Sequence, residues 1–377
     1  MSRLNVLFVL LFILLVGCSN KVKKGNKKNL NNSIKSSAVF LSDVARTGYY
    51  NTKPIYEKPN KINWIFNFER KILSSPVIYK NTLFISDYNN YFYAIDKTNG
   101  ENLWIYPTQR RNSTSATVAN GLVYFGSYDY HLYAIEIENG SFEWKFKANG
   151  YITSSPVVYG GIVFFGSWDK NLYALSADDG KLVWSFETKD RVYTPPAIDD
   201  KNGLVIFGSK TIYACDLKTG EIVWKFSAGD IVEGAPTVGT NHVFVGSRDK
   251  NLYALKKIDG SVVWKHKTSF WITGSAAVAK GIVVVGSYDN YVYGVDETTG
   301  GLLWRHKTSS NIQASVIIAG NVVYGLESGK SVFALNLTDG RFLWEVKSLE
   351  NTLAIPIVED GTIFYLSKNA LFSKERI

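Results

Sequence analysis

The chain has 377 residues, of which 46% are hydrophobic, 20% charged and 14% aromatic, a composition typical of a globular protein. Its formal net charge of +9 arises at the N-terminus: residues 1–36 carry seven Lys/Arg and no acid, whereas the remaining 341 residues carry 35 basic and 33 acidic side chains. A nearly neutral folded part gives no support to nucleic-acid binding. The two cysteines, Cys18 and Cys215, provide no disulfide framework, so packing must stabilise the fold.

The N-terminus has the features of an export signal. Arg3 precedes an unbroken apolar run of eleven residues, 6–16, which is too short to cross ~30 Å of hydrocarbon as a helix but suits the core of a signal peptide. The run ends in Leu15-Val16-Gly17-Cys18, which resembles the lipobox of bacterial lipoproteins. This resemblance implies that residues 1–17 are a signal peptide and that Cys18 is the lipidated first residue of the mature chain. The alternative is a short buried helix with an incidental thiol.

The residues after Cys18 indicate to which membrane the protein is sorted and how it is attached. Ser19 stands where an Asp would resemble an inner-membrane retention signal, so the resemblance favours an outer-membrane address, facing the periplasm, if the host is Gram-negative. Residues 18–39 contain too little apolar surface to fold, and we expect them to form a basic, flexible tether. Its lysines either attract anionic headgroups, at ~1 kcal/mol per Lys, or form a merely soluble spacer. They are Lys21, Lys23, Lys24, Lys27, Lys28 and Lys35.

Tryptophan sets the period of the rest of the chain. It recurs every 40 residues, at Trp64, Trp104, Trp144, Trp184, Trp224, Trp264, Trp304 and Trp344. A glycine precedes seven of these by four residues: Gly100, Gly140, Gly180, Gly220, Gly260, Gly300 and Gly340. Within one unit, residues 153–187, four short β-branched and aromatic runs alternate with turn residues and show no helical periodicity. Each unit is therefore expected to be an antiparallel meander of four strands, A to D.

The number of units follows from the two ends of the repeat. Seven complete units run from about Leu73 to Lys347, and strands A (353–358), B (362–366) and C (370–373) follow without a D strand. The missing D strand lies at the other end, in residues 61–66 around Trp64. A lone four-stranded unit leaves two bare edges and an uncovered face, so the units must close into a ring. The sequence predicts an all-β, eight-bladed β-propeller over residues 40–377, monomeric and closed by an N-terminal strand.

The repeated residues have predictable structural roles. Glycine four residues before each tryptophan permits the positive φ of a tight turn. The tryptophans are expected to dock between neighbouring blades, where each indole N–H needs an acceptor. Ten to twelve residues after a tryptophan the chain has small residues or proline, as in Ser154-Ser155-Pro156, because eight inner strands converge on the axis there.

The segment 94–104 (AIDKTNGENLW) and its copies, such as 214–224, resemble the tryptophan-docking motif of quinoprotein-like (PQQ-like) propellers. Residues 43–49 also resemble the lead-in of that superfamily, so the resemblance covers residues 40–377. Two branches follow from it: the PQQ-dependent dehydrogenases, and the cofactor-free, BamB-like lipoproteins of outer-membrane protein assembly. The size, the lipobox and the bare propeller are similar to the second branch, although the regular 40-residue period and the basic tether are less typical of it.

The sequence offers no catalytic constellation and no metal site. His266 and His306 replace phenylalanines of other units, and His131 and His242 lie in different blades without metal-ligand spacing. The Asp of each B–C turn (Asp129, Asp169, Asp249 and Asp289) recurs too regularly for catalysis and is expected to cap its turn. Cys215 replaces an aliphatic residue of strand C, which predicts a buried, inert thiol. We therefore expect no cofactor and no enzymatic activity.

The departures from the repeat concentrate in the D–A loops, six and seven residues after each tryptophan, at one mouth of the ring. Arginine and large aromatic residues, the types that dominate interface energetics, occur there. The candidate partner-binding residues are Arg70, Lys71, Arg110, Arg111, Tyr151, Arg191, Phe270 and Trp271. The competing explanation for these departures is that the sequence of surface loops varies without functional constraint. The B–C turns are expected to lie away from this mouth. Substitution of their Lys170, Arg248 and Lys250 by alanine is therefore expected to leave partner binding unchanged.

These features favour a non-catalytic envelope lipoprotein that acts as a protein-binding scaffold. A receptor for a cell-wall glycan or another ligand is the second possibility, and a PQQ-dependent dehydrogenase is the third. Co-purification of a protein, of a glycan or of a bound chromophore distinguishes the three.

The lipobox generates the first prediction. A Cys18→Ser variant should retain its signal peptide and lose its lipid, because the lipidated thiol is absent. Mass spectrometry of the membrane fraction, with metabolic labelling by a fatty-acid analogue, measures both effects. Native protein found free in solution, cleaved at another site, would contradict the anchor.

Overall fold

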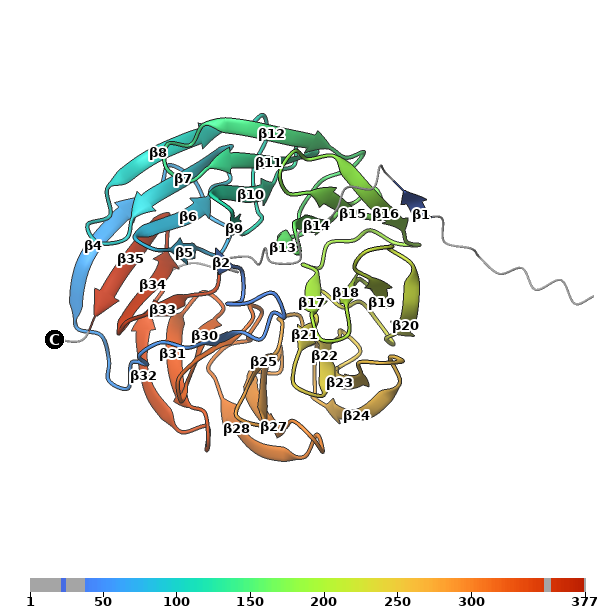
Figure 1. The fold of residues 1–377 in the computed structure, drawn as a ribbon. Coiled ribbons are helices and arrows are strands. Elements are labelled where there is room, and N and C mark those ends of the chain that lie inside the picture. Colours follow the sequence, from blue (N-terminus) through green and yellow to red (C-terminus); the bar gives the residue numbers. More distant parts are fainter. Residues whose placement is uncertain (1–21, 25–37, 349–353, 376–377) are drawn as a thin grey trace, which may run out of the picture.

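Each 40-residue repeat folds into one antiparallel meander whose four strands run from the axis outward as A, B, C and D. The structure is a computed structural model that describes residues 22–24, 38–348 and 354–375. Figure 1 shows its eight sheets arranged in a ring around a central axis. This confirms the predicted eight-bladed β-propeller of four-stranded antiparallel blades. Within the described residues, no helix is long and apolar enough to cross a membrane.

The first four blades follow one another along the chain. Blade 1 consists of β5 (Val77–Tyr79), β6 (Thr82–Ser86), β7 (Tyr91–Asp96) and β8 (Asn102–Pro107). Blade 2 consists of β9 (Thr117–Ala119), β10 (Leu122–Gly126), β11 (His131–Glu136) and β12 (Phe142–Lys147). Blade 3 consists of β13 (Val157–Tyr159), β14 (Ile162–Gly166), β15 (Asn171–Ser176) and β16 (Leu182–Glu187). Blade 4 consists of β17 (Ala197–Asp199), β18 (Leu204–Gly208), β19 (Thr211–Asp216) and β20 (Ile222–Ser227).

The last four blades complete the ring. Blade 5 consists of β21 (Thr237–Val238), β22 (His242–Gly246), β23 (Asn251–Lys256) and β24 (Val262–Lys267). Blade 6 consists of β25 (Ala277–Ala279), β26 (Ile282–Gly286), β27 (Tyr291–Asp296) and β28 (Leu302–Lys307). Blade 7 consists of β29 (Ile317–Ala319), β30 (Val322–Glu327), β31 (Ser331–Asn336) and β32 (Phe342–Lys347). Blade 8 consists of β33 (Ile357–Glu359), β34 (Thr362–Ser367), β35 (Ala370–Glu375) and the N-terminal strand β4 (Lys61–Asn67).

The repeated tryptophans lie at the boundaries between blades. Trp224 of β20 is only 5% exposed, and its Nε1 donates a hydrogen bond to the carbonyl oxygen of Lys257, in the C–D turn of the next blade, at 2.7 Å. Gly260 of that turn has a φ of 69°, and a Cβ added to it would lie 2.5 Å from the indole ring. Glycine is therefore required at this position for two reasons: the turn needs a positive φ, and the neighbouring indole leaves no room for a side chain. The second requirement was not part of the sequence prediction.

The ring is closed by β4, which pairs antiparallel with β35 over its length (Figure 1). The last docking tryptophan faces blade 8, whose D strand is supplied by the N-terminal strand β4. Trp344 Nε1 donates to the carbonyl oxygen of Ile55, at 2.9 Å, from the segment that leads into β4. The N-terminal residues thus replace both the missing strand and the missing acceptor.

A belt formed by residues 38–50 crosses one mouth of the central channel (Figure 1). It begins with β2 (Ala38–Val39), which pairs antiparallel with β9, and ends with β3 (Tyr49–Tyr50), which pairs parallel with β29. Between them, four belt carbonyls accept hydrogen bonds from inner-strand N–H groups spaced 40 residues apart, at Ile198, Val238, Val278 and Ile318. The belt satisfies edge groups that the inner strands of these blades would otherwise leave bare.

Arg46 anchors this belt inside the channel. Its side chain is fully buried and donates hydrogen bonds to the carbonyl oxygens of Pro196 (3.0 Å), Pro156 (2.9 Å) and Phe40. Burial lowers the pKa of the guanidinium to about 9, so the group remains charged at neutral pH. One arginine therefore joins the inner strands of blades 3 and 4 to the belt.

The expected signal peptide, residues 1–17, and the lipidation site Cys18 lie outside the described residues. Of the expected tether, 18–39, two short pieces are described. The strand β1 (Val22–Lys24) pairs with β16 at the outer edge of blade 3, and β2 belongs to the belt.

The docking geometry predicts the effect of losing one indole. Trp224→Ala should lower the free energy of unfolding by about 3–5 kcal/mol, because a buried ring is replaced by a cavity. Trp224→Phe should cost less, since it retains most of the ring and loses mainly the bond to Lys257. Urea denaturation followed by circular dichroism measures both. An alanine variant that unfolds at the wild-type urea concentration would contradict the assigned packing.

Closure of blade 8 by β4 gives a separate prediction. Deletion of residues 61–67, or of 369–377, should abolish cooperative melting or cause aggregation, because the deletion exposes a sheet edge. Deletion of residues 22–24 is the control, since β1 adds to the outside of an already complete blade. Differential scanning calorimetry and light scattering distinguish the variants. A soluble 61–67 deletion with the wild-type melting temperature would show that closure does not depend on β4.

Candidate binding face

The D–A loops and the B–C turns lie at the same end of the blades. The N–H groups of Tyr128, Trp168 and Tyr288, in the B–C turns, donate to carbonyl oxygens of the D–A loops, at Arg111 (3.1 Å), Tyr151 (2.9 Å) and Trp271 (2.9 Å), respectively. We call this surface the loop face. The expectation that the B–C turns lie apart from the D–A loops is therefore wrong. In a meander the chain reverses at every turn, so alternate turns share one end of the blade.

A repeated pair of Asp and Tyr positions the loops. In blade 2 the Asp129 carboxylate accepts hydrogen bonds from the Tyr133 hydroxyl (2.7 Å), the His131 N–H (3.0 Å) and the N–H of Gln109 in the D–A loop (3.1 Å). Burial and the bond to Asp129 raise the pKa of Tyr133, which therefore stays protonated and donates. Similar Asp–Tyr pairs occur in blades 1, 3, 5 and 6. These carboxylates fix their turns, and those of blades 2, 3, 5 and 6 also accept a hydrogen bond from a backbone N–H of the neighbouring D–A loop.

Arg111 lies between two aromatic rings. Its Cζ is 4.5 Å from the ring centroid of Tyr88 and 4.3 Å from that of Tyr128. Two rings thus contact the guanidinium, although the residue as a whole is exposed. Contacts of this kind restrict the side chain.

Aromatic contacts continue from Arg111 across blades 2 to 4. The ring of Tyr151 lies 5.0 Å from that of Tyr128 and 5.1 Å from that of Trp168. The Cζ of Arg191 lies 4.5 Å from the Trp168 ring. We call this set the Arg111 cluster; its members are Tyr88, Arg111, Tyr128, Tyr151, Trp168 and Arg191.

A second cluster occupies blades 5 and 6. The Cζ of Arg248 lies 4.9 Å from the ring of Trp271, and the Nζ of Lys250 lies 5.8 Å from that of Phe270. Trp271 also contacts Tyr288, with ring centroids 5.7 Å apart. We call this set the Trp271 cluster; its members are Arg248, Lys250, Phe270, Trp271 and Tyr288.

The structure thus brings five of the eight candidate residues into two clusters. Arg110 is exposed beside Arg111, whereas Arg70 and Lys71 are exposed at the blade 1 end of the loop face. Sequence reasoning missed six members from the B–C turns: Tyr88, Tyr128, Trp168, Arg248, Lys250 and Tyr288. For four of them a signal was present, because Tyr128, Trp168, Arg248 and Tyr288 vary while the Asp that follows each of them repeats.

The loop face surrounds the open end of the central channel, where a cavity of about 440 Å³ is lined mainly by small hydroxyl-bearing residues. Serines from successive blades link the inner strands: the N–H of Ser75 donates to Ser115 Oγ at 2.9 Å, and that of Ser115 to Ser155 Oγ at 3.0 Å. Phe40 of the belt also lines the cavity. At its edge Arg248 forms an ion pair with Glu233, while its buried Nε has no hydrogen-bond partner.

The residues of this cavity do not fit the quinone of the PQQ-dependent dehydrogenases. That cofactor carries three carboxylates, which require cationic or multiple N–H partners when buried. The charged lining residues here are Arg248 and Glu233, which already neutralise each other. Within the described part of the chain, no group of three or more His, Cys, Asp and Glu side chains is arranged to hold a metal ion. We derive no redox step for this cavity.

Three histidines and Cys215 have structural surroundings, whereas the buried Nδ1 of His242 has no hydrogen-bond partner within the described residues. His131 Nδ1 lies 3.2 Å from Asp129, and His266 Nδ1 lies 3.2 Å from the carbonyl oxygen of Gly300. His306 stacks on Phe342, and burial lowers its pKa. Cys215 is buried as a free thiol, and burial raises its pKa, which disfavours the reactive thiolate.

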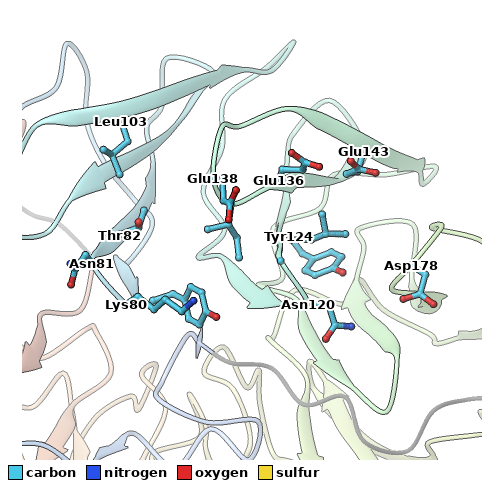
Figure 2. Close-up of a pocket in the computed structure, with 14 residues that line it drawn as sticks. Lys80, Asn81, Thr82, Leu103, Asn120, Tyr124, Glu136, Glu138, Glu143 and Asp178 are labelled. Carbon is cyan, nitrogen blue, oxygen red and sulfur yellow. The ribbon is translucent and has the colours of Figure 1, made fainter.

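A larger hollow, of about 830 Å³, lies at the opposite end of the blades. Figure 2 shows its acidic residues, Glu136, Glu138 and Glu143 of blade 2 and Asp178 of blade 3, with Lys80 on the blade 1 side. None of the candidate partner-binding residues lines it. The two ends of the blades therefore differ in charge: arginines gather on the loop face and carboxylates at this hollow.

The chain is similar to known proteins over most of its length. The family model described as outer membrane protein assembly factor BamB matches residues 55–215 and 208–371. None of the curated proteins matches the sequence. The crystal structure of BamB from Moraxella catarrhalis superposes with a TM-score of 0.72 at 15% identity, over 84% of this chain and 99% of that chain.

Other solved structures share the fold. Quinohemoprotein alcohol dehydrogenase from Comamonas testosteroni superposes with a TM-score of 0.77 at 13% identity, over 91% of this chain and 81% of that chain. The computationally designed protein Ika8 superposes with a TM-score of 0.73 at 17% identity, over 82% of this chain and 98% of that chain. These likenesses extend to enzymes and a designed protein, so they show the fold alone. The match of the family model to both halves of the ring shows that the chain belongs to the family of the outer membrane protein assembly factor BamB.

Proposed function

We propose that this protein is a non-catalytic, lipid-anchored scaffold of the bacterial envelope that binds another envelope protein through its loop face. The observation that carries the proposal is the pair of aromatic–cation clusters on that face. The repeated residues already account for packing and closure, whereas the residues of the two clusters depart from the repeat and contribute side chains to the surface. Family membership supports a role in outer-membrane protein assembly, and the lipobox supports attachment at the outer membrane through Cys18.

The composition of the loop face matches that of protein interfaces. Arginine, tryptophan and tyrosine are enriched at binding hot spots, which lie in well-packed surroundings. Here the large side chains are held before any partner arrives, by ring stacking and by the Asp–Tyr pairs beneath the loops. Binding therefore loses little side-chain entropy, which favours affinity.

A receptor for a glycan is the second candidate. Serine and threonine hydroxyls line the central cavity, beside Tyr193 and Tyr288. Such a lining offers donors and acceptors to a hydroxylated ligand. Binding of muropeptides to the wild-type protein, measured by calorimetry and unaffected by substitutions in the Arg111 cluster, would favour this candidate.

The proposal predicts the effect of a triple substitution. Arg110→Ala, Arg111→Ala and Trp271→Ala together should abolish partner binding and leave the melting temperature unchanged, because these side chains lie on the loop face and none of them is buried. Loss of a hot spot costs at least ~2 kcal/mol, so the combined loss should exceed about a hundredfold. In-cell cross-linking from the loop face, followed by mass spectrometry, identifies the partner, and titration with that partner gives the affinity.

The control set must lie on the opposite end of the blades, because Arg248 contacts Trp271. Lys201→Ala, Ile258→Ala and Arg341→Ala remove two cations and one apolar side chain from turns at that end; Ile258 is 76% exposed. This set should leave partner binding unchanged. Loss of binding in the control set, with retention in the loop-face set, would show that the other end is the binding surface.

A further inference from the structure

We propose that the pocket around Arg111 binds the carboxylate of an acidic side chain in an extended segment of the partner protein. The inference rests on the proposed function and names the chemistry of its partner. The pocket has a volume of about 440 Å³ and is lined by Tyr88, Asn90, Gln109, Arg110, Arg111, Tyr128 and Tyr151. It lies between the loops of blades 1 and 2, at one end of the Arg111 cluster.

Arg111 is held by aromatic rings but has no acidic partner within the described residues. The ring centroids of Tyr88 and Tyr128 lie 4.5 Å and 4.3 Å from its Cζ, so two aromatic rings hold the exposed guanidinium in place. No acidic residue of the described chain forms an ion pair with Arg111 or Arg110, whereas Arg248 is paired with Glu233 and Lys257 with Asp199. A planar guanidinium with free edge N–H groups matches a carboxylate, which accepts two parallel hydrogen bonds. The pocket therefore offers an oriented, unpaired donor to an anion.

The surroundings favour a peptide carboxylate over the phosphates of a membrane surface. Asn90 and Gln109 present neutral amides next to the two arginines, and such groups can both donate to and accept from a peptide backbone. Glu69 and Asp190, in the flanking D–A loops, place negative charge on the same face. An anionic bilayer would meet these carboxylates as well, whereas a peptide contacts only the pocket. Mixed charge of this kind is typical of protein interfaces.

Tyr151 and Trp168 extend the site beyond the carboxylate. Their rings lie 5.1 Å apart and continue from Tyr128 toward Arg191. Successive residues of an extended segment advance by about 3.3 Å, so an apolar side chain one or two residues from the acid can reach these rings. The preferred partner sequence thus combines an acidic residue with a neighbouring apolar residue.

Selection from a display library of random short peptides tests the inference on the full chain. Panning on the wild-type protein, with subtraction on the Arg111→Ala variant, should enrich peptides with an acidic residue beside an apolar one. Enrichment of peptides without acids, or no enrichment after subtraction, would overturn the proposal. The selection needs no knowledge of the natural partner.

Calorimetry on an enriched peptide then measures how much Arg111 contributes to the binding affinity. Arg111→Ala should weaken binding about thirtyfold, and Arg111→Lys about tenfold, because lysine keeps the charge but loses the stacked, planar fork. Replacing the peptide's Glu by Gln, or its Asp by Asn, should weaken binding similarly. Arg305→Ala is the matched control: this arginine stacks on Tyr291 at 5.1 Å on the outer surface of blade 6 and should not affect binding. Equal affinity of wild type and Arg111→Ala would overturn the proposal.

Two further probes separate a peptide carboxylate from a phosphate. Inorganic phosphate and vesicles of anionic phospholipid should not compete with the enriched peptide; competition by either that depends on Arg111 would assign the pocket to phosphate and overturn the proposal. The proposed function fails separately, if the loop-face triple variant keeps its native partner. Loss of that partner together with selection of peptides that lack acids would overturn only the present inference.

Discussion

The contact between an indole of one blade and a glycine of the next is the constraint on which the rest of the structure depends. Each contact combines a buried ring with a hydrogen bond from the indole N–H to a backbone carbonyl of the following C–D turn, as between Trp224 and Lys257. Because a side chain at Gly260 would lie 2.5 Å from the ring, the two blades have one spacing at which they fit. Repetition of this contact around the axis fixes the angle between blades, and with it the number of blades that closes the ring.

At blade 8, where the two ends of the chain meet, the ring needs groups that the repeat does not supply. The last unit lacks both its D strand and the acceptor for Trp344, and one N-terminal segment provides β4 and the Ile55 carbonyl. The belt that precedes it covers the inner edges of the blades and buries Arg46 among inner-strand carbonyls. The ring is therefore joined through residues from the first part of the sequence. The deletion of 61–67 addresses this dependence directly.

Much of the fold could be predicted from the sequence, because the repeated residues are the ones that pack within and between the blades. The 40-residue period of tryptophan, the strand alternation and the unequal ends of the repeat were sufficient for eight blades and for closure by residues 61–66. The belt could not be predicted in this way, because residues 38–50 occur once and their hydrogen bonds involve backbone groups. Arg46 illustrates the limit: its sequence context does not indicate a fully buried cation, which depends on carbonyls from residues more than 100 positions away.

The binding face was predictable only in part, for a geometrical reason. Departures from the repeat identified Arg111 and Trp271 but not their neighbours Tyr128 and Arg248. These neighbours lie 17 and 23 residues away in the sequence, and the meander brings their turns to the same end of the blades. Once these turns are brought together, the distinction between framework and function becomes clear. The Asp–Tyr pairs repeat and hold the loops, whereas the residues stacked above them vary from blade to blade. A face built in this way can change its specificity one loop at a time without altering the contacts between blades, which explains how one propeller framework carries different binding surfaces.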